Sequence, residues 1–359
     1  MKNKFAAPNS KPKSRKYTRL VLQIVVMVAL IAALFYYVFT TSNGEVSFVS
    51  IISNIKLEYL LLAFLSYFGI NILFTIRLQR VLAKEGIKTN FGKTLLAQYA
   101  GMLTSDVTPA RSGYILTPVY LKDQGVPAPV SLSGILGIQS IEFLIKVLGG
   151  TLALFFLMNF ANMTQELMIL AIIGVSLMLT GGLILAAMTW SQRVVAFVEK
   201  IANHRFLKKI TGGLIGKLEE YATNAKKTRK AFPEITAFTF LCWILKGFEW
   251  YFLAVALGIV INVNPVIAWF GFFLIHPLVT ALGFVPTPAG LGAQEWGVVI
   301  VLGTFGVSSV AALSFALIAR ALLIIEDLIG VPQIVKSTSL IFSRKSLQET
   351  TVPPNTQPQ

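Results

Sequence analysis

The first candidates for chemistry in this 359-residue chain are four charged residues in apolar stretches, where charge is costly: Arg111, Glu142, Glu295 and Arg320. Arg111 has a planar guanidinium that suits two phosphate oxygens, although it could also reach an interface or pair with Asp106. Arg320 has no charged neighbour within one helical turn, so we expect a partner on another segment, either Glu295 or Glu142. The four indicate either a site for an anionic group or structural ion pairs.

A Thr-Pro-Ala-x-x-Gly hexapeptide occurs twice, at Thr108 to Gly113 and at Thr287 to Gly292. Proline removes a backbone donor and glycine frees the backbone, so each copy predicts a broken helix. The helix that starts after a break has unpaired N–H groups and a positive dipole end, which suit an anion. The predicted cradle for a headgroup consists of Thr108, Pro109, Gly113, Pro288, Gly290 and Gly292. Helix breaking with close packing is the alternative.

Glu295 follows the second break within one turn, where the helix dipole stabilises a carboxylate. It could act in substrate binding or proton coupling, or simply cap the helix. Two further sets of polar residues share helical faces that should point into a bundle. These are Gln139, Glu142 and Lys146, and Lys246 with Glu249. Pairing within each helix is the simpler interpretation of both.

The composition places these residues in a membrane protein. Hydrophobic residues make up 55% of the chain, charged residues 13%, and the mean hydropathy is +0.71, which excludes an ordinary soluble domain. A single cysteine, Cys242, forms no internal disulfide, and His204 and His276 make no metal cluster. We therefore expect neither a metal nor another cofactor.

The formal charge of +15 reports orientation rather than nucleic-acid binding. Of the 31 Lys and Arg residues, 25 lie in four segments, 1–19, 77–93, 191–235 and 336–345. The loops between the other ends of the predicted helices carry only Lys56. Positive residues favour the cytoplasmic side, so we expect both termini there, in the plasma membrane, and no nucleic acid as partner.

We predict an all-α polytopic membrane protein with about six to eight transmembrane helices. Residues 1–19 and 336–359 are predicted as polar cytoplasmic tails, flanking one transmembrane domain at 20–335. The basic loop 191–235 should lie on the cytoplasmic face. The predicted membrane helices are 20–41, 57–76, 127–158, 166–190, 236–260 and 309–335.

Two further segments are expected to be re-entrant. The stretch 94–121 should enter and leave on the cytoplasmic side, and 265–305 on the other side, with its break at Pro286 to Gly292. Adding the interval between the two hexapeptides to the predicted helix starts at 57 and 127 gives 236 and 306. These positions are close to the predicted starts of two later helices, 236 and 309. This predicts an inverted repeat of 20–160 and 161–335, an architecture typical of transporters.

The second hexapeptide extends into Pro286-Thr287-Pro288-Ala289-Gly290-Leu291-Gly292-Ala293-Gln294-Glu295, and the first is followed by Pro118-Val119-Tyr120-Leu121-Lys122. In these motifs the chain, over about 20–335, resembles the flippase-like family, also called the lysylphosphatidylglycerol synthase transmembrane region. The first half departs from the family pattern. Tyr114 and Thr117 stand where a glutamate and an arginine are expected, and Gln139-Ser140 where a Glu-Arg pair is common.

The resemblance implies an integral membrane protein that moves lipids, or lipid-linked groups, between leaflets. We expect an anionic phospholipid or a polyprenyl-phosphate-linked lipid as the substrate. Because the stretch after about residue 345 is too short for the soluble transferase domain of some relatives, we do not expect lysyl transfer by this chain alone. Two alternatives stay open: a membrane subunit of a glycosyl- or aminoacyltransferase system, and a secondary transporter for a small solute.

Overall fold

The computed structural model describes residues 48–106, 108–160, 165–202, 227–259, 264–282 and 292–337. Every regular element in these ranges is a helix, and five helices are long and apolar enough to cross a membrane. The polytopic helical architecture predicted from composition is therefore confirmed. The predicted first helix 20–41 and both polar tails lie outside the described residues, as does most of the basic loop 191–235.

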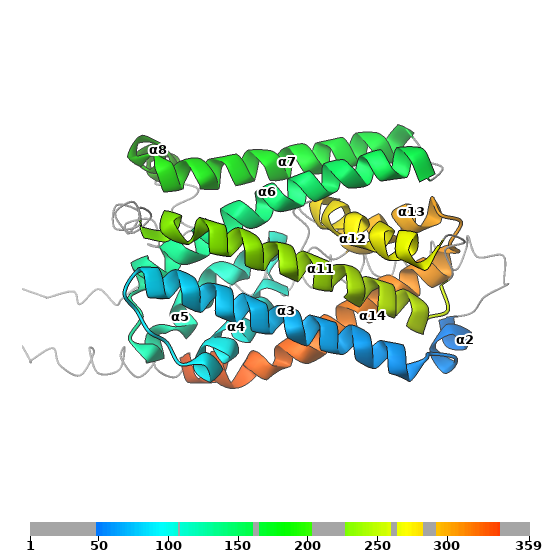
Figure 1. Cartoon of the computed structure of the whole chain (residues 1–359), viewed down its shortest axis with the longest axis horizontal. Helices are drawn as coiled ribbons and strands as arrows, with labels where there is room; N and C mark the ends of the chain where they lie inside the picture. Colours follow the sequence, from blue (N-terminus) through cyan, green and yellow to red (C-terminus); the bar gives the residue numbers. More distant parts are fainter. Residues whose placement is uncertain are drawn as a thin grey trace, which may run out of the picture.

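Five long helices form the body of the molecule and run roughly along its long axis (Figure 1). They are α3 (Leu57–Lys84), α6 (Ala128–Phe160), α7 (Gln165–Trp190), α11 (Phe232–Ala256) and α14 (Ser309–Asp327). The short α2 (Phe48–Ser53) precedes α3, and α8 (Gln192–Ala202) follows α7. The 3-10 turn η4 (Arg229–Ala231) leads into α11, while η6 (Leu328–Gly330) and a helical turn at 331–337 extend α14.

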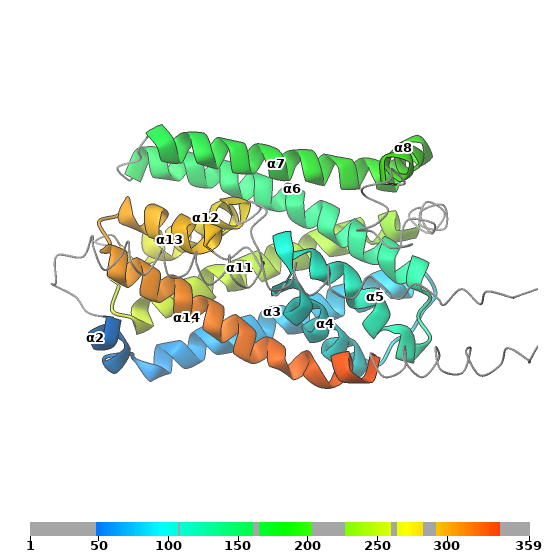
Figure 2. The same cartoon turned by 180° about the vertical axis from the view of Figure 1, so that it is seen from behind.

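The helices are apolar almost all round, so lipid rather than water suits their outer faces. On α6 and α7 large hydrophobic side chains are exposed, among them Leu148, Phe155, Ile173 and Leu177. The buried sides pack α3 against α11, and α6 against α7 and α12. In both views α7 lies on the far side of α6 from the other long helices (Figures 1 and 2).

A broken helical segment occupies one end of the molecule. The helix α4 (Phe91–Asp106) is followed by η1 (Pro109–Leu116), α5 (Thr117–Tyr120) and η2 (Lys122–Gln124). The segment starts at the end where α3 finishes and returns to that end, where α6 begins (Figures 1 and 2). The break therefore falls where the first hexapeptide predicts it.

A second pair of short helices lies toward the opposite end of the molecule (Figures 1 and 2). These are α12 (Pro265–Leu282) and α13 (Ala293–Gly303). Most of the second hexapeptide, including Pro288 and Gly290, falls in 283–291, outside the described residues. Gly292 begins the described chain again and has φ +85°, a positive value that favours glycine.

Two predicted helix boundaries differ from the structure in an informative way. The helix expected at 57–76 continues to Lys84, and the one expected at 236–260 spans Phe232–Ala256. Arg77 and Arg80 were assigned to a cytoplasmic basic segment because their charge ends the apolar run. Leu78, Val81 and Leu82 lie in the same turns of α3 as these arginines and are buried. Their packing continues the helix beyond Arg77 and Arg80.

Candidate functional site

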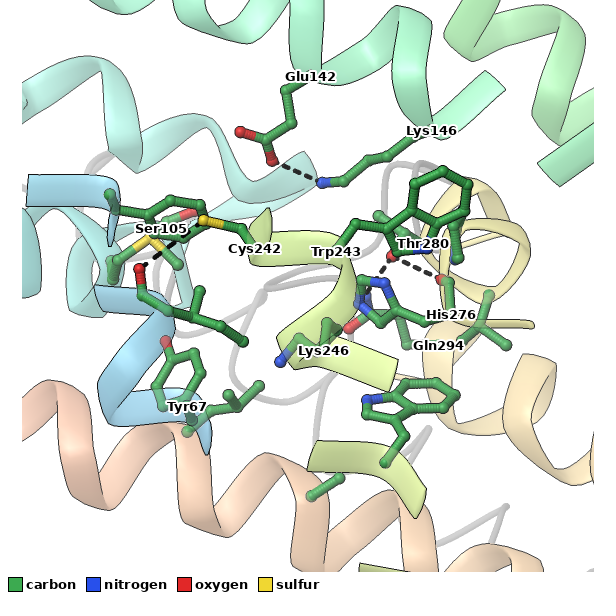
Figure 3. A pocket seen from close by; sticks show the side chains of 18 of the residues that line it. Tyr67, Ser105, Glu142, Lys146, Cys242, Trp243, Lys246, His276, Thr280 and Gln294 are labelled. Atoms are coloured by element: carbon green, nitrogen blue, oxygen red, sulfur yellow. Dashed lines mark hydrogen bonds and ion pairs between the residues drawn. The ribbon is translucent and has the colours of Figure 1, made fainter. Parts of the chain in front are cut away.

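A cavity of about 220 Å³ lies between the two broken segments and the long helices. Among the described residues, seven α-helices contribute to its wall, α3, α4, α6, α11, α12, α13 and α14, and the 3-10 helix η1 adds Tyr114. Figure 3 shows how side chains from several of them converge. The charged residues that line it are Arg77, Asp106, Glu142, Lys146, Lys246, Glu295 and Arg320.

The first ion-pair cluster joins three helices through Glu142 of α6. Lys146, one turn further along α6, donates to Glu142 Oε1 at 2.7 Å. Arg77 of α3 donates from Nη2 to Glu142 Oε2 at 3.2 Å and from Nη1 to Thr239 Oγ1 of α11 at 2.7 Å. Pairing within the helix was expected for Glu142 and Lys146, and the structure adds a second cation to the same carboxylate.

Arg77 is the functional candidate that sequence reasoning missed. Its side chain is 1% exposed and its guanidinium carbon lies 4.5 Å from the centroid of the Phe74 ring. Its Nε has no hydrogen-bond acceptor among the described residues. The available signal was the helical spacing of Leu78, Val81 and Leu82, which continues the buried face of α3 beyond Arg77.

The second cluster lies beside the second break. Arg320 of α14 contacts Glu295 of α13, with Nε 2.5 Å from Oε1, and its Nη2 donates to Gln294 Oε1 at 2.9 Å. Of the two acids expected to pair with Arg320, Glu295 is therefore the one. The other Glu295 oxygen accepts the backbone N–H of Gly292 at 2.8 Å. One carboxylate thus caps α13 and holds α14, so the capping and pairing interpretations are both correct.

A third pair lies within α11. Lys246 donates to both oxygens of Glu249, at 2.8 Å and 2.6 Å, as the i, i+3 spacing predicts. The Lys246 ammonium also lies 4.8 Å from the centroid of the Tyr67 ring. In Figure 3 the Lys246 side chain lies between Tyr67 and the group of His276 and Gln294.

The electrostatic balance of the cavity is close to neutral. Four cations, Arg77, Lys146, Lys246 and Arg320, come from four different helices. Glu142, Glu249 and Glu295 hold them in ion pairs, and Asp106 is a further acid on the wall. Separating one partner of a buried pair is unfavourable unless another charge replaces it. An anionic ligand can provide that replacement by taking the place of a carboxylate.

The first broken segment is held by its own polar side chains. Thr108 Oγ1 accepts the N–H of Gly113 at 2.6 Å and donates to the carbonyl of Thr104 at 2.8 Å. A Cβ on Gly113 would lie 2.2 Å from the Thr104 oxygen, so a larger residue cannot fit without a backbone shift. Thr108 and Gly113 therefore form the turn itself, which agrees with the packing alternative.

Neutral hydrogen bonds occupy the positions where charges were expected. The Tyr114 hydroxyl donates to Gln98 Oε1 of α4 at 2.9 Å, and Thr117 Oγ1 donates to the Tyr114 carbonyl at 2.7 Å. Tyr114 also lines the cavity. The departure from the family pattern thus leaves a polar wall without an ion pair between residues 114 and 117.

The predicted site residues divide into those the structure brings together and those it leaves undescribed. Glu142, Glu295 and Arg320 line one cavity, and Gly292 adjoins it through its bond to Glu295. The side chains of Pro109 and Arg111 lie outside the described part of the chain, so the role predicted for Arg111 stays a prediction. Within the described ranges, no three His, Cys, Asp or Glu residues are grouped to hold a metal ion.

Comparison with known proteins identifies the family of this chain. No curated protein matched the chain. A family model described as the lysylphosphatidylglycerol synthase TM region matches residues 21–328, which include all the long helices and the cavity. The chain therefore belongs to the lysylphosphatidylglycerol synthase transmembrane-region family.

Proposed function

We propose that this protein moves a lipid with an anionic headgroup between the two leaflets of the plasma membrane. The substrate would be an anionic phospholipid or a polyprenyl-phosphate-linked lipid. The observation that carries the proposal is the convergence of four cationic side chains, one each from α3, α6, α11 and α14, on one cavity. Membership of a family linked by its description to lysylphosphatidylglycerol supports a lipid substrate.

The ion pairs suggest how a headgroup would be bound and released. A phosphate would replace Glu295 as acceptor for Arg320, whose planar guanidinium matches two phosphate oxygens. Because Glu295 also accepts the Gly292 N–H, its displacement would loosen the start of α13. Binding of the anion would thereby be coupled to movement of the second broken segment.

The two broken segments would then act as opposed re-entrant tips. The segment α4 to α5 and the pair α12 and α13 lie toward opposite ends of the molecule (Figure 1), as an inverted repeat requires. The positive-inside pattern of the sequence supports a cytoplasmic location for both termini, and hence for the α4 end. Alternating exposure of the cavity past one tip or the other would carry the headgroup across.

Reconstitution tests the proposal directly. Liposomes would contain a labelled anionic phospholipid or polyprenyl phosphate, and the label's accessibility from outside would be followed over time. We expect wild type to accelerate exchange, and Arg320→Gln to lose about tenfold or more, since a charge-assisted hydrogen bond contributes about 1.5–3 kcal/mol. Arg111→Ala, in the same assay, tests the phosphate-binding role predicted from the sequence for Arg111, whose side chain lies outside the described part of the chain.

The matched control is Lys84→Gln, which removes a cation from a pair with Glu234 that is 40% and 34% exposed. It should transport like wild type. The proposal fails if no anionic lipid exchanges faster with protein than without it, or if Arg320→Gln matches Lys84→Gln.

A second candidate rests on the family's description, which names a synthase. The chain would then be a membrane subunit that supports an aminoacyl- or glycosyltransferase. Repeated co-purification of such an enzyme, together with loss of its lipid product when this chain is removed, would favour that role. Uptake of a small solute driven by an ion gradient, without lipid exchange, would instead favour the solute-transporter alternative.

A further inference from the structure

Two adjacent carboxyl groups at the end of α14 take no part in the three ion-pair clusters. Glu326 and Asp327 are 1% and 0% exposed. The Tyr99 hydroxyl of α4 donates to Glu326 Oε1 at 3.0 Å, and the Tyr67 hydroxyl of α3 donates to Asp327 Oδ1 at 3.0 Å. The pair therefore ties the end of α14 to the first broken segment and to α3.

Two buried acceptor atoms lie close together here, because the Asn71 side chain is within hydrogen-bond reach of Glu326. Glu326 Oε2 and Asn71 Oδ1 lack a hydrogen-bond partner among the described residues. Asn71 is 0% exposed, and its amide nitrogen donates to the Tyr67 carbonyl at 3.3 Å. Buried acceptors are nearly always satisfied. A proton on Glu326 would change one of these acceptors into a donor.

The charges around Glu326 also favour a bound proton. Glu326 forms no ion pair with any described residue. The nearby cation, Lys246 of α11, already contacts Glu249 at 2.6 Å and lies over the Tyr67 ring. A buried carboxylate that lacks its own cation is costly, and a bound proton removes that charge.

The position next to the cavity makes such a proton relevant to transport. Tyr67 and Lys246 both line the cavity, and so does Leu323, one helical turn before Glu326. The following turn, η6, is wedged against α4, since a Cβ on Gly330 would lie 2.2 Å from the Ala100 nitrogen. Tyr99 connects Glu326 directly to α4, which belongs to the broken segment proposed above as the first tip.

We propose that Glu326 binds a proton reversibly and couples its movement to lipid transport, an inference that rests on the proposed function. Uptake of a proton from water forms an O–H bond on Glu326 Oε2 and removes one negative charge. Release breaks that bond and restores the carboxylate. Glu295 suits this role less well, because both of its oxygens are occupied by Arg320 and Gly292.

Infrared difference spectroscopy on the purified full-length protein tests the proton site without any transport. Spectra would be recorded across a pH series in lipid vesicles for wild type and Glu326→Gln. We expect a protonated-carboxyl band that appears as the pH falls and is lost in Glu326→Gln. Glu234→Gln, in the exposed pair with Lys84, should leave the band unchanged. Identical difference spectra for wild type and Glu326→Gln would overturn the site.

A second variant covers the case in which Glu326→Gln fails to fold. Tyr99→Phe keeps the aromatic ring and removes the hydrogen-bond donor to Glu326 Oε1. The band should then persist with a displaced titration. An unchanged titration in Tyr99→Phe would count against Glu326 as the source of the band.

The coupling itself is tested in the lipid-exchange assay with an imposed pH gradient. Wild type should show a rate that depends on the gradient, whereas in Glu326→Gln the rates with and without it should become equal while exchange continues. Equal rates in wild type would overturn the coupling. If no variant exchanges lipid but the titrating band is present, the proposed function fails and the proton site stands.

Discussion

The two halves of the chain each place a glutamate and an arginine against the cavity, but in opposite arrangements. In the first half the long helix α6 carries the acid, Glu142, and a neighbouring helix supplies Arg77. In the second half the long helix α14 carries the base, Arg320, and the acid Glu295 stands just after a break. The interval between the two hexapeptides relates Arg320 to the position next to Glu142, so near-equivalent positions of the predicted repeat hold charges of opposite sign.

This difference indicates that the two ion-pair clusters have different roles. Glu142 is held by two cations on uninterrupted helices, so its cluster fixes the relative positions of α3 and α6. Glu295 belongs to a helix that starts at Gly292, and moving that start moves the carboxylate. We expect the first cluster to contribute mainly to stability and the second mainly to transport.

The largest expected effect on stability comes from Glu142→Gln. The substitution leaves Arg77, 1% exposed, without a carboxylate. Removing one partner of a buried pair costs about 3–5 kcal/mol, which should lower the midpoint of thermal unfolding and the yield of folded protein. Glu234→Gln, which breaks an exposed pair, should cost about 0–1 kcal/mol. Equal midpoints for the two variants would contradict the structural role of the first cluster.

The next largest effect tests how tightly the turn at the first break is packed. Gly113→Ala brings a Cβ to 2.2 Å from the Thr104 oxygen, and the required shift should cost about 1–3 kcal/mol. Gly303→Ala is the matched control, because a Cβ there meets nothing within 4 Å at the end of α13. Thermal unfolding in detergent would measure both. A Gly113→Ala protein as stable as Gly303→Ala would show that the first turn adapts freely.

The long helices and the pairing rules were predictable from sequence, because both depend on short-range patterns. Apolar length indicated α6 and α7, and one-turn spacing indicated the pairs of Glu142 with Lys146 and of Lys246 with Glu249. The absence of a charged neighbour indicated a distant partner for Arg320. These inferences required no knowledge of how the helices pack.

Arg77 and Glu326 were missed for a physical reason. Each stands beside residues typical of a membrane interface, and hydropathy alone assigns such residues to the surface. Their burial follows from tertiary packing: Thr239 and Glu142 approach Arg77 from two other helices, and Tyr99 approaches Glu326 from α4. The spacing of Leu78, Val81 and Leu82 indicates that α3 stays buried past Arg77, but no local pattern identifies the partners on other helices.

Glu295 both caps α13 and pairs with Arg320, and a smaller difference in stability between two variants separates these roles. Glu295→Gln keeps an oxygen that can accept the Gly292 N–H but removes the charge that Arg320 needs, whereas Glu295→Ala removes both. The alanine variant should therefore be less stable than the glutamine variant by about 1 kcal/mol, the usual contribution of a cap. Both should transport poorly. Equal stability of the two would mean that the cap contributes nothing.

The smallest expected effect comes from substituting Glu85, a buried acid outside the cavity. The change should raise stability at neutral pH, whereas Glu142→Gln should lower it. The Glu85 side chain is 1% exposed, with Lys227 Nζ 3.8 Å and Thr228 Oγ1 3.2 Å from its two oxygens. Burial raises the pKa of Glu85 above its usual value of 4.5, and the hydrogen bond from Thr228 and the charge of Lys227 offset only part of this.

Because the folded protein holds that proton more tightly than the unfolded chain, the stability it contributes is complete below pH 4.5 and is lost as the pH rises through the higher folded pKa. Glu85→Gln keeps an acceptor for Thr228 and removes the charge. We expect it to be slightly more stable than wild type at neutral pH and to lack that decline, as followed by unfolding midpoints over a pH series. Parallel pH profiles for the two proteins would show that Thr228 and Lys227 fully offset the burial of Glu85.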